Sequence, residues 1–516
     1  MRSSRTASVP LAWIPILLAF AFALPSAAEE LFEVASFPNR GRCVAAELAE
    51  LNGDGRADLF VVVLLGIPPE ERRIIRVYLQ RPDGSLPESP DHTLRVPEWS
   101  AVYDIADLVE ESPGAELVLL QPEGITLLSL ADASGKSWQL PVPGPTTVGL
   151  ADDERGLEPY TLVYDDFGDE PWILVPQIGR LTALSPKGEV RARLDVPRRA
   201  NYLILPRTGL VAIESDFQIF VDVPKLAIGD VDGDGRIDIV SSTRHEIRVF
   251  LRRKDGSYPQ APDRTLPLRL VAPRDHIRGS GGVASEIADI NGDGRLDLLI
   301  SQVKGGFTDA ATTIFLYLNH GGEWKLGDPD QTLTSNASIG SNALFDMDRD
   351  GRRELFSIEF QFSMLEVIEL LMSREIDIDV AIYRYNEKEH FGKRPWMKKK
   401  LSLPVNFDTL RLRGFVPVGN VDVNSDGFLD FVSSGGGKAL EIHLGDAKGP
   451  LSQWGGRQKM STAGVIHFAD FDGDPLPDFV LHDPHHFDAP VQVGRNLGAL
   501  PGTPPSLLAR PPKAGP

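Results

Sequence analysis

The sequence predicts an all-β protein, a β-propeller of seven blades or eight with calcium-binding loops. Three observations lead to this fold class. An acidic nine-residue segment occurs six times, a short apolar run rich in β-branched residues follows the copies, and longer stretches around them resemble one another. Repeats at intervals of about 40 to 50 residues are typical of propellers, in which each blade is a four-stranded sheet.

The acidic segments share one order of oxygen-bearing side chains. Asp, Asn or Glu stands at positions 1, 3 and 5, Gly usually stands at position 6, and a carboxylate stands at position 9. The copies are ELNGDGRAD (50–58), DVDGDGRID (230–238), DINGDGRLD (289–297), DMDRDGRRE (346–354), DVNSDGFLD (422–430) and DFDGDPLPD (470–478). Calcium takes about six to eight oxygen ligands, and one such turn offers three side chains, the carbonyl of residue 7 and a final carboxylate. The segments therefore predict calcium sites, and Gly at position 6 allows the sharp bend that an ion requires.

An EF-hand would use similar ligands, but the residues after the segments exclude it. That motif needs Glu at position 12 and a helix on either side of the loop. Position 12 is occupied in this chain by Val61, Ser241, Ile300, Ser357, Ser433 and Leu481. Runs such as LFVVV (59–63) and LLI (298–300) follow the loops and predict buried strands.

The spacing of the segments defines the repeat unit. The last five copies begin 59, 57, 76 and 48 residues apart, and the stretches 77–94, 249–266 and 316–333 align with one another throughout. The longer gap from residue 50 to residue 230 must then hold units without an ion. Its candidates are DLVEESPGAEL (107–117), ADDERGLEPYTL (151–162) and a hairpin over 181–196. Counting these units predicts seven blades or eight.

The two ends of the chain lie outside the predicted propeller of residues 29–495. Residues 1–28 have the basic start, apolar middle and small-residue end of a secretory signal, so we expect an exported protein with no transmembrane segment in its mature form. Residues 496–516 are Pro-rich and predict an extended tail. The lone Cys43 excludes an internal disulfide and is expected to be a small core residue.

The loops and the strands that follow them resemble the FG-GAP or VCBS-type repeats of integrin α chains and of many exported bacterial proteins. The resemblance covers roughly residues 40–495 and implies a calcium-binding propeller with up to six ions. Loop 470–478 is the least certain site, because Pro475 takes the Gly position and its fixed φ cannot supply a left-handed turn. In loop 50–58, Glu50 replaces the first Asp with a longer side chain.

The predicted metal ligands are side-chain oxygens, together with the backbone carbonyl of the residue at position 7. Carried onto this chain, they are Glu50, Asn52, Asp54, Arg56 and Asp58; Asp230, Asp232, Asp234, Arg236 and Asp238; Asp289, Asn291, Asp293, Arg295 and Asp297; Asp346, Asp348, Asp350, Arg352 and Glu354; Asp422, Asn424, Asp426, Phe428 and Asp430; and Asp470, Asp472, Asp474, Leu476 and Asp478.

Two further features are candidates for function. An insertion at 363–400 is predicted to contain a short helix (Ser363 to Met372) and a basic stretch from Lys388 to Lys400 that could meet an anionic glycan, a lipid head group or an acidic partner, or form a solvated loop. His482, His485 and His486 could bind a transition metal, although without a second cluster at ligand spacing an ordinary turn is the simpler interpretation.

The composition favours a binding module over an enzyme. The net charge is −20, and 21 of the 73 acidic residues stand at ligand positions, so that outside them the mature chain carries 52 acidic and 51 basic residues. An acidic chain does not suit nucleic acid. The chain has no nucleophile elbow, no zinc-protease motif and no phosphate-binding loop. We expect a secreted, periplasmic or cell-surface module that binds a protein or a cell-surface glycan. The alternatives are a polysaccharide-active lyase or hydrolase and a structural member of an envelope complex.

Overall fold

The computed structural model describes residues 30–507, apart from 68–69, 151–156, 169, 197–199, 205–216, 222, 271–281, 306–310, 336–337, 361–371, 407–410 and 413. The expected signal (1–28), the end of the tail (508–516) and most of the expected helix at 363–372 fall outside these residues. The start of the tail lies against the last blades, where Leu500 is buried and Asn424 donates a hydrogen bond to the carbonyl of Pro501 (2.9 Å).

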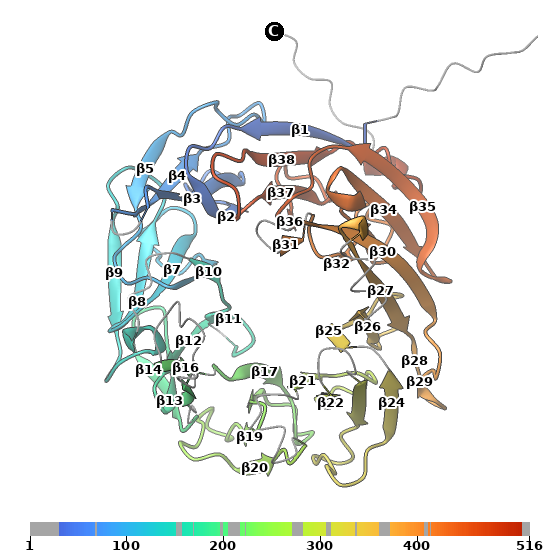
Figure 1. Cartoon of the computed structure of the whole chain (residues 1–516). Coiled ribbons are helices and arrows are strands. Elements are labelled where there is room, and N and C mark those ends of the chain that lie inside the picture. The colour runs from blue at the N-terminus through green and yellow to red at the C-terminus, as the bar shows by residue number, and fades with distance from the viewer. Residues whose placement is uncertain are drawn as a thin grey trace, which may run out of the picture.

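The described strands form eight antiparallel blades arranged in a closed ring, which is the higher of the two expected counts (Figure 1). In each blade the first strand lies nearest the centre of the ring and the fourth lies at the outside.

The blades are numbered along the chain, and each contains four strands. Blades 1 to 3 contain β2 (Arg42–Ala49), β3 (Asp58–Leu65), β4 (Arg72–Tyr78) and β5 (His92–Arg95); β6 (Val102–Ala106), β7 (Glu116–Gln121), β8 (Gly124–Ser129) and β9 (Ser137–Pro141); and β11 (Val163–Tyr164), β12 (Trp172–Gln177), β13 (Arg180–Leu184) and β14 (Val190–Leu194). Blades 4 to 6 contain β17 (Lys225–Gly229), β18 (Asp238–Ser242), β19 (Glu246–Phe250) and β20 (Arg264–Pro267); β21 (Gly282–Ala288), β22 (Asp297–Lys304), β23 (Ala311–Tyr317) and β24 (Gln331–Ser335); and β25 (Ser338–Phe345), β26 (Glu354–Phe360), β27 (Glu375–Tyr383) and β30 (Met397–Asn406). Blades 7 and 8 contain β32 (Val418–Val421), β33 (Asp430–Ser433), β34 (Ala439–Asp446) and β35 (Gly449–Lys459); and β36 (Val465–Ala469), β37 (Asp478–His482), β38 (Val491–Asn496) and β1 (Phe32–Phe37).

A few short elements lie beside the four-stranded blades. Strands β10 (Glu158–Pro159) and β31 (Arg411–Leu412) extend blades 2 and 6, while two hairpins pair β15 (Ala200–Ile204) with β16 (Phe217–Val221) and β28 (Tyr385–Asn386) with β29 (His390–Phe391). The 3-10 helices are η1 (Thr147–Leu150), η2 (Gly435–Gly437) and η3 (Pro505–Leu507).

The gap between the first two acidic loops contains blades 2 and 3 and the hairpin β15–β16. The predicted ion-free unit at 107–117 is the connection from β6 into β7, and the predicted hairpin at 181–196 is β13–β14. Residues 151–156 of the third candidate lie outside the described residues, and its remainder holds β10.

The ring is closed by the two ends of the chain. Strand β1 pairs with β38 in antiparallel register from Phe32 opposite Asn496 to Phe37 opposite Val491, so the start of the chain supplies the outer strand of the last blade. Eight clusters of buried apolar side chains among the described residues lie one between each pair of neighbouring blades. Because a blade packs on both faces, its second strand is buried along nearly its whole length, as in β3, where Leu59 to Leu64 are all buried. Cys43 is fully buried between blades 8 and 1, which confirms its expected place in the core.

Candidate metal centres

The six acidic loops occupy the same connection in six blades, between the first and the second strand. In every one the position 9 carboxylate is the first residue of the second strand: Asp58, Asp238, Asp297, Glu354, Asp430 and Asp478. The loops therefore lie on one face of the ring and lead directly into strands, which agrees with the exclusion of an EF-hand.

Each loop is a tight turn with two left-handed positions, except loop 470–478, which has one. Gly at position 6 has φ between +77° and +107° in the five loops that contain it, as predicted. Position 4 is also left-handed in all six, with φ of +56° at Arg349 and +54° at Ser425, where the residue is not Gly. We did not predict this second bend, although Gly at position 4 in four of the six loops is its signal in the sequence.

Side-chain oxygens turn inward and organise the loop through backbone N–H groups. In loop 289–297 the Asp289 carboxylate accepts hydrogen bonds from the N–H groups of Gly292 and Gly294, both at 2.8 Å. Asn291 Oδ1 accepts from the N–H of Asp293, and Asp293 Oδ1 accepts from the N–H of Arg295, both at 2.9 Å. Positions 1, 3 and 5 thus gather their oxygens within one turn.

The two loops that differ from the shared pattern, 50–58 and 470–478, keep many of these hydrogen bonds. Glu50 Oε1 accepts the N–H groups of Asn52, Gly53 and Asp54 at 2.5 to 3.1 Å, so its longer side chain still reaches the turn. In loop 470–478, Asp470 accepts the N–H of Gly473 (2.8 Å), but Pro475 has no N–H to donate from position 6.

Three loops bring three carboxylates close enough for one cation. Ligand oxygens lie within 4.8 Å of one another in the groups Asp230, Asp232 and Asp234; Asp346, Asp348 and Glu354; and Asp470, Asp472 and Asp478. The third group belongs to the loop that carries Pro475. The other three loops have Asn at position 3, whose amide oxygen is also a calcium ligand.

Loop 346–354 gives the best test of fit for a cation. Asp346 Oδ1 and Glu354 Oε1 are buried and have no hydrogen-bond partner, and they lie in the same three-carboxylate group. Burial raises the pKa of Glu354 to about 8. Uncompensated buried carboxylate oxygens are costly, and a hard cation is the partner that would satisfy them. Arg384 supplies part of the balancing charge, since its guanidinium contacts Asp348 and lies 3.7 Å from Asp350.

The position 9 carboxylate has a structural role of its own. Asp297 Oδ2 accepts the N–H of Ile290 (3.0 Å) and Oδ1 accepts the N–H of Asn319 (2.8 Å), which follows the third strand. The aspartates of loops 50–58, 230–238, 422–430 and 470–478 make the same pair of bonds. Burial raises the pKa of Asp58 and Asp297 to about 6, and that of Asp430 and Asp478 to about 7. These oxygens therefore fasten the loop to the blade, whatever they contribute to an ion.

Blade 2 supports this structural role because it lacks the acidic turn. Glu116, the first residue of β7, is fully buried and its Oε2 accepts the N–H groups of Leu108 (3.0 Å) and Val109 (3.2 Å). The carboxylate is thus present at the start of the second strand in a blade where the nine-residue spacing of the metal pattern is broken.

Three segments of the chain match the model of the FG-GAP-like repeat: residues 230–300, 289–357 and 422–481. Each begins at the first residue of one acidic loop and ends within the strand that follows the next acidic loop, which is β22, β26 or β37. The chain contains FG-GAP-like repeats within a β-propeller. A search of curated proteins found no match.

Several solved structures match this chain at low sequence identity. An Agrocybe aegerita lectin that recognises non-reducing terminal N-acetylglucosamine is 15% identical, with 90% of this chain and 96% of that chain covered and a TM-score of 0.35. The V. cholerae biofilm matrix protein Bap1 is 12% identical, with 78% and 81% covered and a TM-score of 0.34. The Dos1 propeller is 7% identical, with 89% and 95% covered and a TM-score of 0.32.

Neighbouring loops of the propeller are bonded to one another around the ring. The N–H of Leu296 donates to the carbonyl of Asp230 (2.8 Å), so loop 289–297 is braced against loop 230–238. Amide side chains add further links to the position 2 carbonyl of the preceding loop: Gln80 to Phe471 (2.6 Å), Asn319 to Val231 (2.7 Å) and Asn496 to Val423 (2.8 Å). We did not predict these amides, although the shared YLQ and YLN after the third strands of blades 1 and 5 are their signal.

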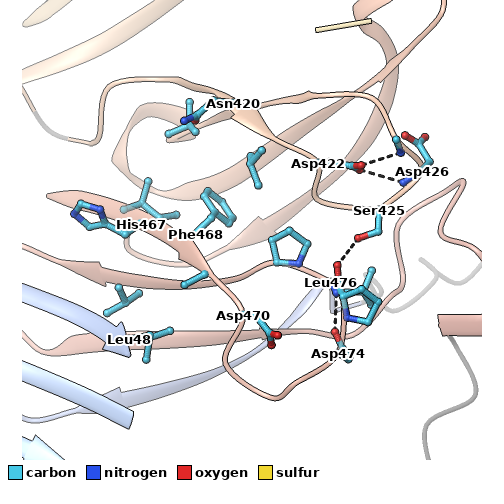
Figure 2. A pocket seen from close by; sticks show the side chains of 18 of the residues that line it. Leu48, Asn420, Asp422, Ser425, Asp426, His467, Phe468, Asp470, Asp474 and Leu476 are labelled. Carbon is cyan, nitrogen blue, oxygen red and sulfur yellow. Dashed lines mark hydrogen bonds between the residues drawn. The ribbon is translucent and has the colours of Figure 1, made fainter. Parts of the chain in front are cut away.

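A groove of about 910 Å³ lies between loops 422–430 and 470–478 of the propeller (Figure 2). Asp422 and Asp426 line it from one loop, and Asp470 and Asp474 line it from the other. Ser425 Oγ donates to the carbonyl of Pro475 (2.5 Å) and joins the two loops. The two turns therefore share one acidic hollow.

Much of the region 363–400, which the sequence predicted to be an insertion, belongs to the strands of blade 6. It contains β27 and the start of β30, which are the third and fourth strands of blade 6. Its extra length lies partly in these strands of nine and ten residues and in the hairpin β28–β29. Lys398 pairs with Asp379 (2.9 Å) and Lys400 with Asp377 (2.7 Å) across the two strands. The strand partners of these lysines account for their charge without an anionic ligand.

The three histidines near residue 482 do not form a metal site among the described groups. His482 is buried in β37 and stacks on His467 with ring centroids 6.2 Å apart. The N–H of His485 donates to Asp483 Oδ1 (2.9 Å), and His486 Nδ1 lies 2.6 Å from Asp483 Oδ2. The ordinary turn is therefore the better interpretation.

Burial of His482 should make the protein less stable in acid. Burial lowers the pKa of His482 to about 4, with a smaller contribution from His467. A depressed folded-state pKa stabilises the fold above pH 6.5, and this contribution, up to about 3 kcal/mol, is lost as the pH falls toward 4. We expect His482→Gln to lose correspondingly less stability than the wild type between pH 7 and pH 4.5 in urea denaturation. The exposed His486 serves as the control, and an equal loss in His482→Gln and His486→Gln would contradict the prediction.

Within the part of the chain that the structure describes, no helix has the length and apolar character needed to cross a bilayer.

Proposed function

We propose that this protein is an exported, calcium-loaded β-propeller that serves as a binding or scaffolding module for an extracellular protein or a cell-surface glycan. Calcium binding is supported most directly by loop 346–354, where two buried carboxylate oxygens without hydrogen-bond partners lie close to a third carboxylate. The six repeated loops support one ion each, as the family resemblance implies.

The ions would stabilise the ring. The inward carboxylates of positions 1, 3 and 5 repel one another in the absence of a cation, and each loop is bonded to its neighbour or to the strand that follows. An ion bound only by the folded loop stabilises the whole fold by mass action. A chain with one cysteine would thereby gain the cross-links that other exported proteins obtain from disulfides.

The binding part follows from what the ring exposes. A propeller presents its connecting loops on two faces, and rigidly held loops are the usual place for recognition. Two hollows, the groove between loops 422–430 and 470–478 and a second one on the opposite face, offer concave surfaces that combine polar and apolar groups.

Calcium binding is tested by calorimetric titration of the metal-free protein, with three to six ions expected and magnesium as the comparison.

Recognition of a glycan or a protein is tested on glycan and protein arrays with and without a chelator. Retention of a glycan or protein without turnover supports the module, and cleavage of a polysaccharide would point to an enzyme instead. The proposal fails if calcium produces no saturable heat.

A further inference from the structure

A second hollow, of about 580 Å³, lies where blades 1 and 2 meet. Its walls come from the turn that joins β5 to β6, from the turn that joins β7 to β8, and from the end of β9. The acidic loops join first strands to second strands, whereas these turns join second to third strands and one blade to the next. In antiparallel blades the two kinds of connection lie at opposite ends, so this hollow opens on the face away from the acidic loops.

The residue that marks the hollow is Trp99, whose side chain is 47% exposed. Its backbone has φ of +67°, a left-handed conformation that is rare and strained for a bulky side chain. Strain of this kind persists only where the surroundings enforce it, and it is found at binding sites more often than elsewhere.

Two side chains enforce the turn from inside. The buried Arg73 donates to the carbonyls of Ser100 and Pro97, and Gln121 Nε2 donates to the carbonyl of Glu98 (2.7 Å). The turn is thus held by its own backbone carbonyls while the indole ring remains in contact with solvent. A large apolar ring kept at the surface by hydrogen bonds to the backbone of its turn is suited to stacking against a ligand.

The remaining lining decides which ligand suits the hollow. Glu98, Glu123, Gln121 and Gln139 provide carboxylate and amide groups, and the lining contains no Lys, Arg or His. An apolar surface with a few polar groups is typical of small-molecule sites, and an indole face also attracts an ammonium group. The carboxylates would accept hydrogen bonds from hydroxyl or ammonium groups and would repel an anionic ligand.

We propose that the Trp99 hollow binds a sugar unit of an oligosaccharide by stacking on the indole ring, and that it prefers amino sugars and neutral sugars to uronic acids. This inference rests on the proposed function in one respect, since it supplies the ligand site that a glycan-binding module needs. Because the hollow lies away from the acidic loops, its test can fail while calcium binding stands.

Calorimetry on the calcium-loaded protein tests the proposal with four probes of equal length: a glucosamine tetramer, cellotetraose, tetragalacturonate and tetralysine. Saturable binding is expected for the first two and not for tetragalacturonate. Trp99→Gly should weaken that binding at least tenfold, because Gly keeps φ near +67° without strain while the ring is lost. Trp454→Ala is the matched control, since Trp454 is 54% exposed on β35 in another blade, and it should leave the affinity unchanged.

A double variant tests the contribution of the two carboxylates of the hollow. Glu98→Gln with Glu123→Gln should reduce the preference for the glucosamine tetramer over cellotetraose about tenfold while leaving cellotetraose affinity within threefold. Thermal melts of all variants should coincide with the wild type. The proposal is overturned if neither sugar binds at millimolar concentration, if Trp99→Gly binds as the wild type does, if tetragalacturonate is the preferred sugar, or if tetralysine alone binds.

Discussion

Removing calcium with a chelator is expected to lower the midpoint of thermal unfolding of this propeller by roughly 10 °C. A site occupied at a hundred times its dissociation constant adds about 2.7 kcal/mol to the free energy of unfolding. Several such sites add on the order of 10 kcal/mol, and for a chain of this size each kcal/mol moves the midpoint by about 1 to 2 °C. The loops are bonded into their neighbours, so their loss should propagate around the ring.

Calorimetric or circular-dichroism melts in excess calcium and in excess chelator measure this shift. Restoring calcium to the chelated sample should return the midpoint to its starting value, whereas sodium at equal ionic strength should not. If the unfolding midpoints in calcium and in chelator coincide, the proposed ions do not stabilise the fold.

The second large effect is expected from Asp297→Ala, at a cost of about 2 to 4 kcal/mol in the free energy of unfolding both with and without calcium. The substitution leaves the buried N–H groups of Ile290 and Asn319 without an acceptor, and each unsatisfied group costs about 1 to 3 kcal/mol. Urea denaturation with the midpoint and slope fitted separately measures the change.

Asp293, at position 5 of the same loop, is the matched comparison. It is exposed and accepts the N–H of Arg295 within the turn, so Asp293→Ala should cost less than about 1 kcal/mol in chelator and distinctly more in calcium. Glu116→Ala in blade 2, which lacks the acidic turn, should follow the calcium-independent pattern of Asp297→Ala. If Asp297→Ala were harmless in chelator, position 9 would be a metal ligand only, contrary to its hydrogen bonds.

The two variants separate roles that the sequence pattern merges. Position 9 stands beside positions 1, 3 and 5 in the nine-residue segment and carries the same kind of group. The position 9 carboxylate is buried because the paired strands enclose it. The same pairing brings distant N–H groups to it, as in Asp58, which accepts the N–H of Gln80, 22 positions further along. The pattern alone cannot distinguish a carboxylate that meets an ion from one that joins a loop to a strand.

The features that could be predicted from the amino-acid sequence are local or periodic. The acidic turns, their left-handed Gly residues and the strands after them are encoded within about a dozen adjacent residues, and their recurrence predicted the propeller. These features can be recognised because a turn needs particular residues at particular offsets, and because a strand buried on both faces is rich in apolar residues.

The remaining features depend on contacts between distant residues. The count of eight blades depends on blades 2 and 3, which lack the metal pattern, and on β1 pairing with β38 across the whole length of the chain. The partners of Lys398 and Lys400 are on a neighbouring strand, so these two lysines of the basic stretch are paired within their own blade. The exposed position of Trp99 depends on Arg73 and Gln121, which hold its turn from other strands. Such contacts have no fixed spacing in the chain, since they arise where the blades pack side by side.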